Sequence, residues 1–229
     1  MSVASMCASL GNNNAMCRLL AARADVGGAF PAVSMAAFSD NEKGVQILCQ
    51  CSSPNVRNVY GICALENACA GGSVASVKHL LVHATPDTLS GALHAAAICT
   101  GGSAELVELL LEARADINAP YVVWTRLERL YLFLQSVQYQ LGKKTPATTL
   151  AQHFEGSTPL MLAVMTGQYE IAAKLIAAGG RLNSRNQTVA DLANRLPLPD
   201  FLRKALDGRE DQCREVAALS LAMLHHETL

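Results

Sequence analysis

The side chains that could bind a metal or act as nucleophiles are a histidine pair and eight cysteines. His79 and His83 are four residues apart, so on a helix both imidazoles would lie on one face. A metal site needs one or two more ligands, and Cys69 and Cys99, in adjacent segments of the chain, are conceivable ones. No CxxC pair occurs, so we expect no metal and reduced thiols that pack as small apolar residues. The cysteines are Cys7, Cys17, Cys49, Cys51, Cys63, Cys69, Cys99 and Cys213.

No motif in the sequence indicates catalysis or a bound cofactor. Residues 142–145, GKKT, lack the upstream glycine of a phosphate-binding loop, and no Gly-x-Ser-x-Gly elbow occurs. Glu105, Glu108 and Glu112 are three and four residues apart, which is typical of a solvated helix face. We therefore expect no enzyme, no cofactor and no catalytic residue.

The charge balance argues against nucleic acid as a partner. The 229 residues carry a net charge of -1, and only 16% are charged while 51% are hydrophobic. Arg126, Arg129, Lys143 and Lys144 are interleaved with aromatic residues, a pattern that single-strand binding uses. Glu128 interrupts them, however, and the overall charge is balanced. The sequence favours protein partners.

The sequence contains no membrane-spanning segment, because its apolar runs are shorter than the roughly 18 residues that a span requires. The first ten residues, MSVASMCASL, lack the basic start of a secretory signal. The unpaired cysteines predict an intracellular, reducing compartment. The cytoplasm is the first choice, while an organelle remains open if a targeting peptide was removed, as does peripheral association with a membrane complex.

A unit of two short helices recurs along the chain. In each copy an Ala-rich segment is followed, after a turn, by a segment with Val or Ile and Leu at helical spacing. One such pair cannot bury its own apolar side, so the copies must stack. The copies are recognised by Leu19-Leu20, Ile47-Leu48, Leu80-Leu81, Leu109-Leu110 and Leu175-Ile176.

These units resemble ankyrin repeats. Thr158-Pro159-Leu160 followed by Gly167 is similar to the T-P-L-H-x-A signature of that family, and His94 is the position that matches its histidine. The resemblance implies that Thr158 caps a helix that Pro159 starts. Met161 departs from the pattern, and the first two units lack Thr-Pro. The remaining matching positions are the unit endings Asp116, Asn118 and Asn183.

The fold class expected is therefore all-α: an ankyrin-repeat solenoid of about six partly degenerate helix pairs with one long helical insertion. We predict about four repeats over 1–118, the insertion over 119–155, a repeat and a C-terminal capping repeat over 156–208, and a tail helix over 209–229. No polar capping helix precedes the first unit. The chain is then a piece of a longer protein, or its first repeat leans on a partner, or Asn12–Asn14 and the first helix form a short cap.

The insertion concentrates the aromatic residues of the chain. Val123, Leu127, Leu130, Leu134, Val137 and Leu141 form a heptad-like stripe, which predicts one helix from Val122 to Leu141, about 30 Å long. We expect the stripe to pack against neighbouring repeats and to leave Leu132 and Phe133 on another side, available to a partner. The predicted contact residues are Tyr121, Trp124, Tyr131, Phe133 and Tyr139, flanked by Arg126 and Arg129.

The resemblance implies protein binding without catalysis, through the concave face and, here, the aromatic insertion. Two alternatives stay open: a free adaptor that meets its partners transiently, and an accessory subunit fixed in a large assembly. A third, substrate adaptor of a ubiquitin ligase, rests on residues 195–202, RLPLPDFL, which resemble the end of a recruitment box without its first half.

Overall fold

The computed structural model describes residues 1–99 and 104–180, and within this part the chain forms twelve α-helices and no β-strand. Ten of the helices form five consecutive pairs. The pairs are α1 (Val3–Ser9) with α2 (Asn13–Ala21), α3 (Ala32–Phe38) with α4 (Glu42–Cys51), α5 (Ala64–Ala70) with α6 (Val74–Leu81), α7 (Pro86–Ile98) with α8 (Ala104–Glu112), and α11 (Pro159–Met165) with α12 (Tyr169–Ala177).

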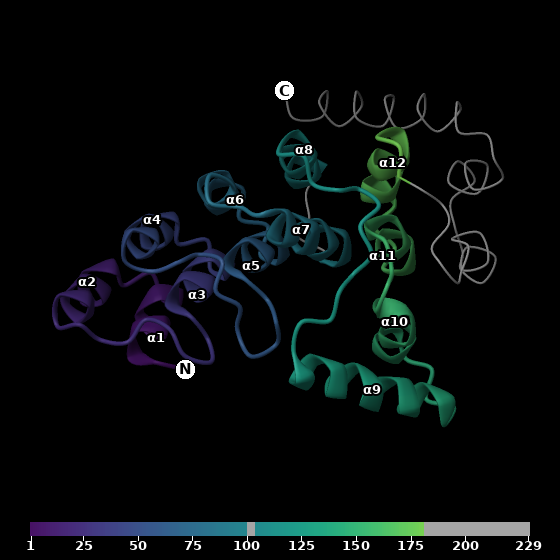
Figure 1. The fold of residues 1–229 in the computed structure, drawn as a ribbon, viewed down its shortest axis with the longest axis horizontal. Helices are drawn as coiled ribbons and strands as arrows, with labels where there is room; N and C mark the ends of the chain where they lie inside the picture. The colour runs from purple at the N-terminus through teal and green to yellow at the C-terminus, as the bar shows by residue number, and fades with distance from the viewer. Residues whose placement is uncertain (100–103, 181–229) are drawn as a thin grey trace.

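The pairs stack side by side, so that the first helices form an inner row and the second helices an outer row (Figure 1). Along the inner row α1 contacts α3, α3 contacts α5, α5 contacts α7, and α7 contacts α11. Along the outer row α4 contacts α6, α6 contacts α8, and α8 contacts α12. The predicted all-α solenoid of stacked helix pairs is confirmed.

Small residues let the inner helices approach one another closely. Ala36, Ala68 and Ala96, one from each of three consecutive inner helices, are completely buried. The outer helices contribute the larger side chains, such as Leu48 and Leu110, which fill the space between the rows. Each pair thereby covers the apolar side that its neighbour cannot bury alone.

Polar links between neighbouring pairs fix how they stack. The Asn41 side chain caps α4 and donates to the carbonyl of Ala8, 2.9 Å away in the preceding pair. Thr166 donates to the carbonyl of Ala97 at 3.0 Å, which ties α11 to α7. The buried ammonium of Lys174 on α12 donates to the carbonyl of Ala104 at 2.9 Å and pairs with Glu108 on α8.

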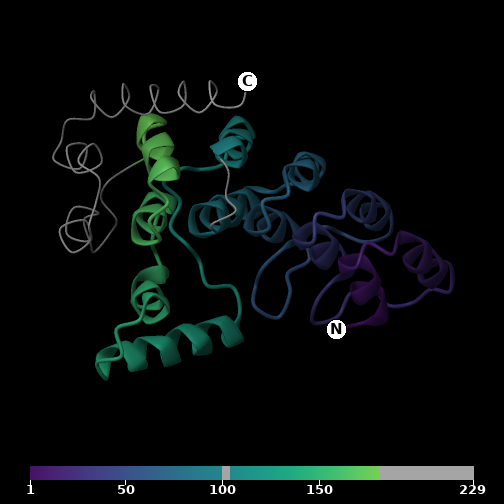
Figure 2. The same cartoon turned by 180° about the vertical axis from the view of Figure 1, so that it is seen from behind.

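The insertion leaves the stack and returns to the same place. The amide of Tyr121 donates to the carbonyl of Ser157 at 2.8 Å, and the amide of Gly156 donates to the carbonyl of Tyr121 at 3.0 Å. Between these points the chain forms α9 (Arg126–Gln140) and α10 (Pro146–Phe154), which pack against each other. Both extend from the inner row, on the side away from the outer helices (Figures 1 and 2). The fourth pair therefore contacts the fifth as if the insertion were not there.

The long insertion helix is shorter than predicted. It begins at Arg126 instead of Val122 and spans 15 residues, roughly 22 Å. Thr125 stops it from starting earlier: its side chain accepts from the amide of Glu128, which is the N-cap arrangement, and the backbone of Thr125 is extended. Helix α10 was not predicted, although Thr145-Pro146 is the same start signal as Thr158-Pro159.

The predicted capping repeat, the tail over 209–229, and with them Asn183 and Cys213, lie outside the described residues. Across 1–99 and 104–180, no helix has both the length and the apolar character needed to cross a membrane.

Candidate protein-binding surface

The insertion helix α9 presents its apolar side to solvent. The heptad positions from Leu127 to Leu141 lie on one side of the helix, which we call the α9 apolar face, and all of them are exposed, whereas Val123, which precedes the helix, is buried. Leu130 is 53% exposed and Leu134 is 51% exposed, values typical of surface residues. The prediction that this stripe packs against neighbouring repeats is therefore wrong for its members from Leu127 to Leu141, and only Val123 is covered. The α9 apolar face consists of Leu127, Leu130, Leu134, Val137 and Leu141.

The opposite side of α9 contacts α10, and this explains the reversal. Glu128 is buried and Leu132 and Tyr139 are partly buried on that side, and the hydroxyl of Ser136 donates to the side chain of Gln152 at 2.6 Å. The side that faces the protein is thus the more polar one. Leu132, which we expected to remain available to a partner, is partly covered instead.

Glu128 fixes this orientation because it accepts hydrogen bonds from the segment that leads into the helix. The Tyr121 hydroxyl donates to it at 2.6 Å and the amide of Trp124 at 2.9 Å. Burial raises the pKa of the Tyr121 hydroxyl, and the hydrogen bond to Glu128 raises it further, so Tyr121 remains a donor. The Tyr121 ring also makes edge contacts with His94, at 5.3 Å between centroids, and with Phe154, at 4.4 Å.

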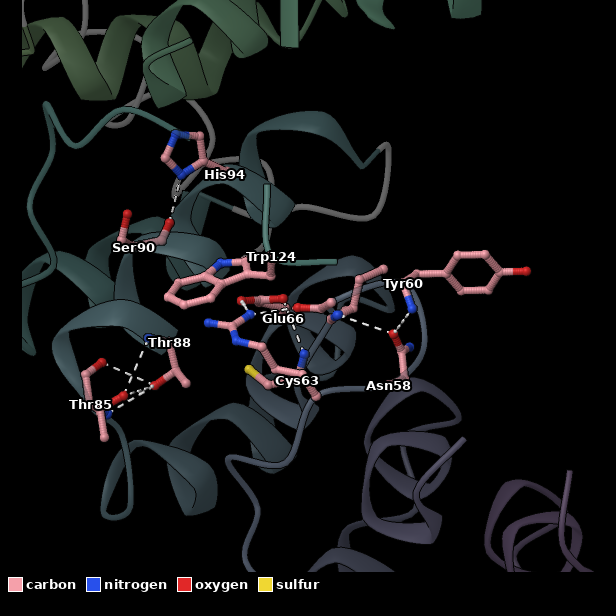
Figure 3. Close-up of polar contacts among 12 residues, drawn as sticks. Asn58, Tyr60, Cys63, Glu66, Thr85, Thr88, Ser90, His94 and Trp124 are labelled. Atoms are coloured by element: carbon pink, nitrogen blue, oxygen red, sulfur yellow. Dashed lines mark hydrogen bonds and ion pairs between the residues drawn. The ribbon is translucent and has the colours of Figure 1, made fainter. Parts of the chain in front are cut away.

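Trp124 is held against the loop between α4 and α5. The guanidinium of Arg57 lies 4.1 Å from the centre of its ring, and Arg57 is paired with the buried carboxylate of Glu66 at 2.7 Å. Figure 3 shows the Trp124 ring beside Glu66, with Asn58 and Cys63 on the same loop. Gly61 has a positive φ of 81°, and a Cβ there would lie 3.0 Å from the Cβ of Trp124, so the loop approaches this closely only with glycine.

A groove with a volume of about 490 Å³ lies between this loop and the helices α9 and α10. We call it the insertion groove. Its lining is mainly apolar and aromatic, and Tyr131 stands at the edge that it shares with the exposed side of α9. The lining residues are Tyr60, Ile62, Tyr121, Glu128, Tyr131, Leu132, Ala147, Leu150, Ala151 and Phe154.

The predicted contact residues fall into two groups. Trp124, Tyr131 and Phe133 are exposed large apolar residues, and Arg126 and Arg129 are exposed on the flank of the α9 apolar face. Tyr121 and Tyr139, in contrast, are only partly accessible: Tyr121 connects the insertion to the stack, and the ring of Tyr139 lies under Lys144, 5.7 Å from its ammonium. The leucines of the exposed face were not among the predicted contacts, because an apolar heptad stripe predicts packing against neighbouring repeats.

The motif residues of the repeat occupy turns and helix starts. Thr158 accepts from the amide of Met161 at the start of α11, Pro159 is the first residue of that helix, and Gly167 follows its end with a φ of 75°. Asp116 accepts from the amide of Asn118 at 2.9 Å in the turn after α8.

His94, another motif residue, lies in the interior of α7 and is almost completely buried. Its Nε2 lies 3.0 Å from the carbonyl oxygen of Ser157, and its Nδ1 lies 2.7 Å from that of Ser90. Burial lowers the pKa of His94, although the hydrogen bonds to carbonyls act in the opposite direction. His94 thus connects the fourth pair to the fifth across the base of the insertion.

The described cysteines are free thiols, and two of them belong to the core. Burial raises the pKa of Cys63 to about 12 and also raises that of Cys69, which removes both from thiolate chemistry at neutral pH. Cys69 and Cys99 do not join the histidine pair, contrary to the ligand set considered from the sequence. Cys49 does: its sulfur and one ring nitrogen each of His79 and His83 lie within 4.8 Å of one another.

A second exposed apolar surface lies on α1 at the N-terminal end of the stack. Val3 is 65% exposed and Leu10 is 78% exposed, and Met6 lies between them at helical spacing. No helix of the described residues covers this side of α1, because its only helix contacts of any extent are with α2 and α3.

Stacked helix pairs with glycine turns between their helices are the architecture of helix-pair repeat solenoids. Residues 33–121 match the sequence family described as ankyrin repeats in three copies, and residues 155–187 match the single ankyrin repeat. The chain belongs to the ankyrin-repeat family. Ankyrin repeats are typically protein–protein interaction modules and are generally not catalytic.

Among solved structures, the chain is similar to the human ASB11 ankyrin repeat domain. The sequence identity is 22% and the TM-score 0.49, over 90% of this chain and 96% of that chain. No curated protein matches the chain with statistical significance. Residues 195–202, on which the ubiquitin-ligase alternative rests, lie outside the described part of the chain.

Proposed function

We propose that this protein is a non-catalytic binding module that recognises its partner through the insertion. The observation that carries the proposal is the exposure of the α9 apolar face. Of the large hydrophobic residues that are exposed in the described part of the chain, half lie between Val122 and Leu141. Large exposed apolar patches on soluble proteins mark interaction sites.

The partner that fits this surface best is an amphipathic helix of another protein. Leu127, Leu130, Leu134, Val137 and Leu141 repeat at steps of three and four, which is the spacing that packs against a second helix. Tyr131 and Trp124 border the face and supply large amphipathic contact area. The adjacent insertion groove, of about 490 Å³, has room for an aromatic or aliphatic side chain of that partner. Arg126 and Arg129 on the flank favour a partner helix with acidic edges.

The test replaces two exposed leucines and leaves the fold alone. Leu130→Gln with Leu134→Gln removes apolar area from the centre of the face, and a hot-spot pair of this kind is expected to weaken binding by at least about 2 kcal/mol, roughly thirtyfold. Proteins crosslinked to the wild-type chain in its own cells are compared quantitatively with those crosslinked to the double variant.

The matched control is Val82→Gln, because Val82 is 82% exposed and lies in the outer row, far from the insertion in sequence. The partner is expected to be lost with the double variant and kept with the control. Recovery of the same proteins by all three chains would refute the proposal. A wild-type dimer that the double variant converts to a monomer would show that the face binds a second copy of this chain.

The exposed side of α1 favours a second candidate, an accessory subunit fixed in a large assembly. Val3, Met6 and Leu10 form an apolar surface at the end of the stack opposite to α12. The described part of the chain therefore has two separate exposed apolar faces, this one and the α9 apolar face. A fixed subunit needs both faces covered, whereas a transient adaptor needs one. Met6→Gln with Leu10→Gln distinguishes them: loss of partner recovery with this variant as well as with the α9 variant supports the subunit.

A further inference from the structure

Cys49, His79 and His83 come together in the outer row, on the other side of the stack from the proposed protein-binding surface. Cys49 lies near the end of α4, His79 near the end of α6, and His83 in the turn that follows α6. One ligand atom from each residue lies within 4.8 Å of the other two. We propose that these three residues form a binding site for Zn²⁺ that joins two adjacent repeats.

The composition of the cluster selects the metal. A thiolate and two imidazoles are the ligands that Zn²⁺ binds in proteins, and hard cations such as Mg²⁺ and Ca²⁺ prefer oxygen. In a tetrahedral site with a Zn–S distance of about 2.3 Å and Zn–N distances of about 2.0 Å, the ligand atoms are roughly 3.3–3.6 Å apart. Because the three ligand atoms lie within 4.8 Å of one another, their separations exceed those of a loaded site by no more than about 1.5 Å, a difference that side-chain rotation can close.

The backbone around the cluster is already held in place. Helices α4 and α6 pack directly against each other in the outer row. The side chain of Asn55, in the loop that follows α4, donates to the backbone carbonyl of His83 at 2.9 Å. The turn that carries His83 is thus tied to the segment that follows Cys49, so the three ligands do not have to be collected from independent parts of the chain.

Within the described residues, the cluster supplies three protein ligands and leaves the fourth position open. Cys49 and His79 are partly buried and His83 is exposed, so the open position faces solvent. Water or a side chain from another protein completes the tetrahedron there. When Zn²⁺ binds, the Cys49 thiol releases its proton to solvent and the two imidazoles coordinate in their neutral form.

The test uses Co²⁺ as a spectroscopic probe of the purified full-length chain. Co²⁺ occupies tetrahedral zinc sites, and a thiolate ligand produces a sulfur-to-cobalt charge-transfer absorption in the near ultraviolet. We expect this absorption in the wild-type protein, its disappearance on addition of Zn²⁺, and its absence in Cys49→Ser. His79→Gln is expected to weaken Zn²⁺ binding at least as much as loss of an outer-shell partner does, about 10- to 100-fold.

Two cysteines serve as matched controls. Cys51 is exposed and only two residues from Cys49. Cys213 lies in the same C-terminal part of the sequence as a second histidine pair, His225-His226, so it tests whether that pair binds the metal instead. Cys51→Ser and Cys213→Ser should keep the absorption. Absorption that survives in Cys49→Ser, or that is lost in Cys213→Ser, would overturn the assignment. So would a wild-type protein that gives no charge-transfer band with Co²⁺.

Thermal unfolding gives an independent readout. Because the site joins α4 to α6 only in the folded chain, Zn²⁺ should raise the Tm of the wild type in a concentration-dependent manner and leave that of Cys49→Ser unchanged. Equal shifts in both proteins would contradict the proposal. The site and the α9 apolar face share no residue, so a negative result here leaves the proposed function untouched.

Discussion

At the scale of single residues, His94 is the side chain on which two repeats depend. A neutral imidazole carries one N–H, so only one of the carbonyls of Ser90 and Ser157 receives a hydrogen bond from it at a time. The other faces a ring nitrogen without a proton. Burial of the ring disfavours the protonated imidazole, whereas a carbonyl that faces a ring nitrogen without a proton favours it. The balance between these two effects sets the pKa of His94.

Removing the His94 ring should destabilise the stack. His94→Ala removes the ring hydrogen bonding to these carbonyls, of which that of Ser157 keeps the amide of Tyr121 as a donor, and opens a cavity beside Tyr121, so we expect the free energy of unfolding to fall by about 1–3 kcal/mol. Urea unfolding followed by circular dichroism measures the change. Asp116→Ala, in an exposed turn, is the control and should have a much smaller effect. An equal loss in both variants would show that His94 contributes no more than a surface turn residue.

His94 also predicts a pH dependence of stability. Because burial lowers its pKa in the folded state below 6.5, the unfolded chain binds the proton first as the pH falls. The contribution of His94 is therefore complete above 6.5 and is lost below it, by at most about 1.4 kcal/mol per pH unit. His94→Gln cannot take up the proton. The difference in unfolding free energy between wild type and this variant should shrink on acidification, and a constant difference would contradict the assignment.

At the scale of elements, the orientation of α9 depends on its first turn. Glu128 joins the capping box with Thr125 to the hydroxyl of Tyr121 and the amide of Trp124. Together with the packing of α9 on α10, this carboxylate therefore holds its own side of the helix against the protein. The heptad pattern of leucines does not determine this orientation, because burial of apolar area alone would turn the leucine side of the helix toward the protein.

Loss of that carboxylate should release the insertion while the stack remains. Glu128→Ala is expected to destabilise the α9–α10 hairpin by about 1–3 kcal/mol and to speed protease cleavage between Tyr121 and Thr145. Glu128→Gln keeps an acceptor and should show a smaller effect. Hydrogen exchange separates the hairpin from the stack: faster exchange in α5 and α7 as well as in α9 would mean that the insertion does not open on its own.

The elements also show how far the sequence could predict the structure. The ankyrin pairs follow from local signals that agree with tertiary packing, such as Thr158-Pro159 before a helix and Gly167 after it. The exposed side of α9 could not be predicted in this way. An apolar stripe predicts a buried helix face, and the sequence of one chain does not show whether that face is covered by the same chain or by another protein. The ligand cluster was missed for another reason. Which cysteine meets His79 depends on how α4 stacks on α6, and spacing along the sequence does not contain that information.

At the scale of the whole molecule, the insertion is separable from the repeat stack. The segment leaves at Tyr121 and returns at Gly156, and these two residues are joined by a backbone hydrogen bond of 3.0 Å. The pairs on either side contact each other directly, α7 with α11 and α8 with α12. Each repeat contacts mainly its neighbours, so the stack does not require the hairpin for its own connectivity.

Deletion of residues 122–155, with Tyr121 joined to Gly156, should leave a folded stack that no longer binds the partner. The deleted chain loses the contacts of Leu150 and Phe154 with the core, worth about 2 kcal/mol, which lowers the Tm by about 4–8 °C. Circular dichroism and scanning calorimetry measure both quantities. A deleted chain that unfolds or aggregates would show that α10 is part of the solenoid, and one that keeps its partner would exclude the insertion from recognition.

The place where the insertion branches off has a consequence for how the chain is made. In an uninterrupted array a new repeat docks on the previous one as soon as it is synthesised, so folding proceeds from one end to the other. Here the fifth pair can cover the fourth only after the whole insertion has left the ribosome. His94 and Ser157, which meet at the junction between these pairs, are 63 residues apart. Loop closure over that distance costs entropy, so the junction should be the slowest step in assembly and the point at which a nascent chain is most exposed to chaperones.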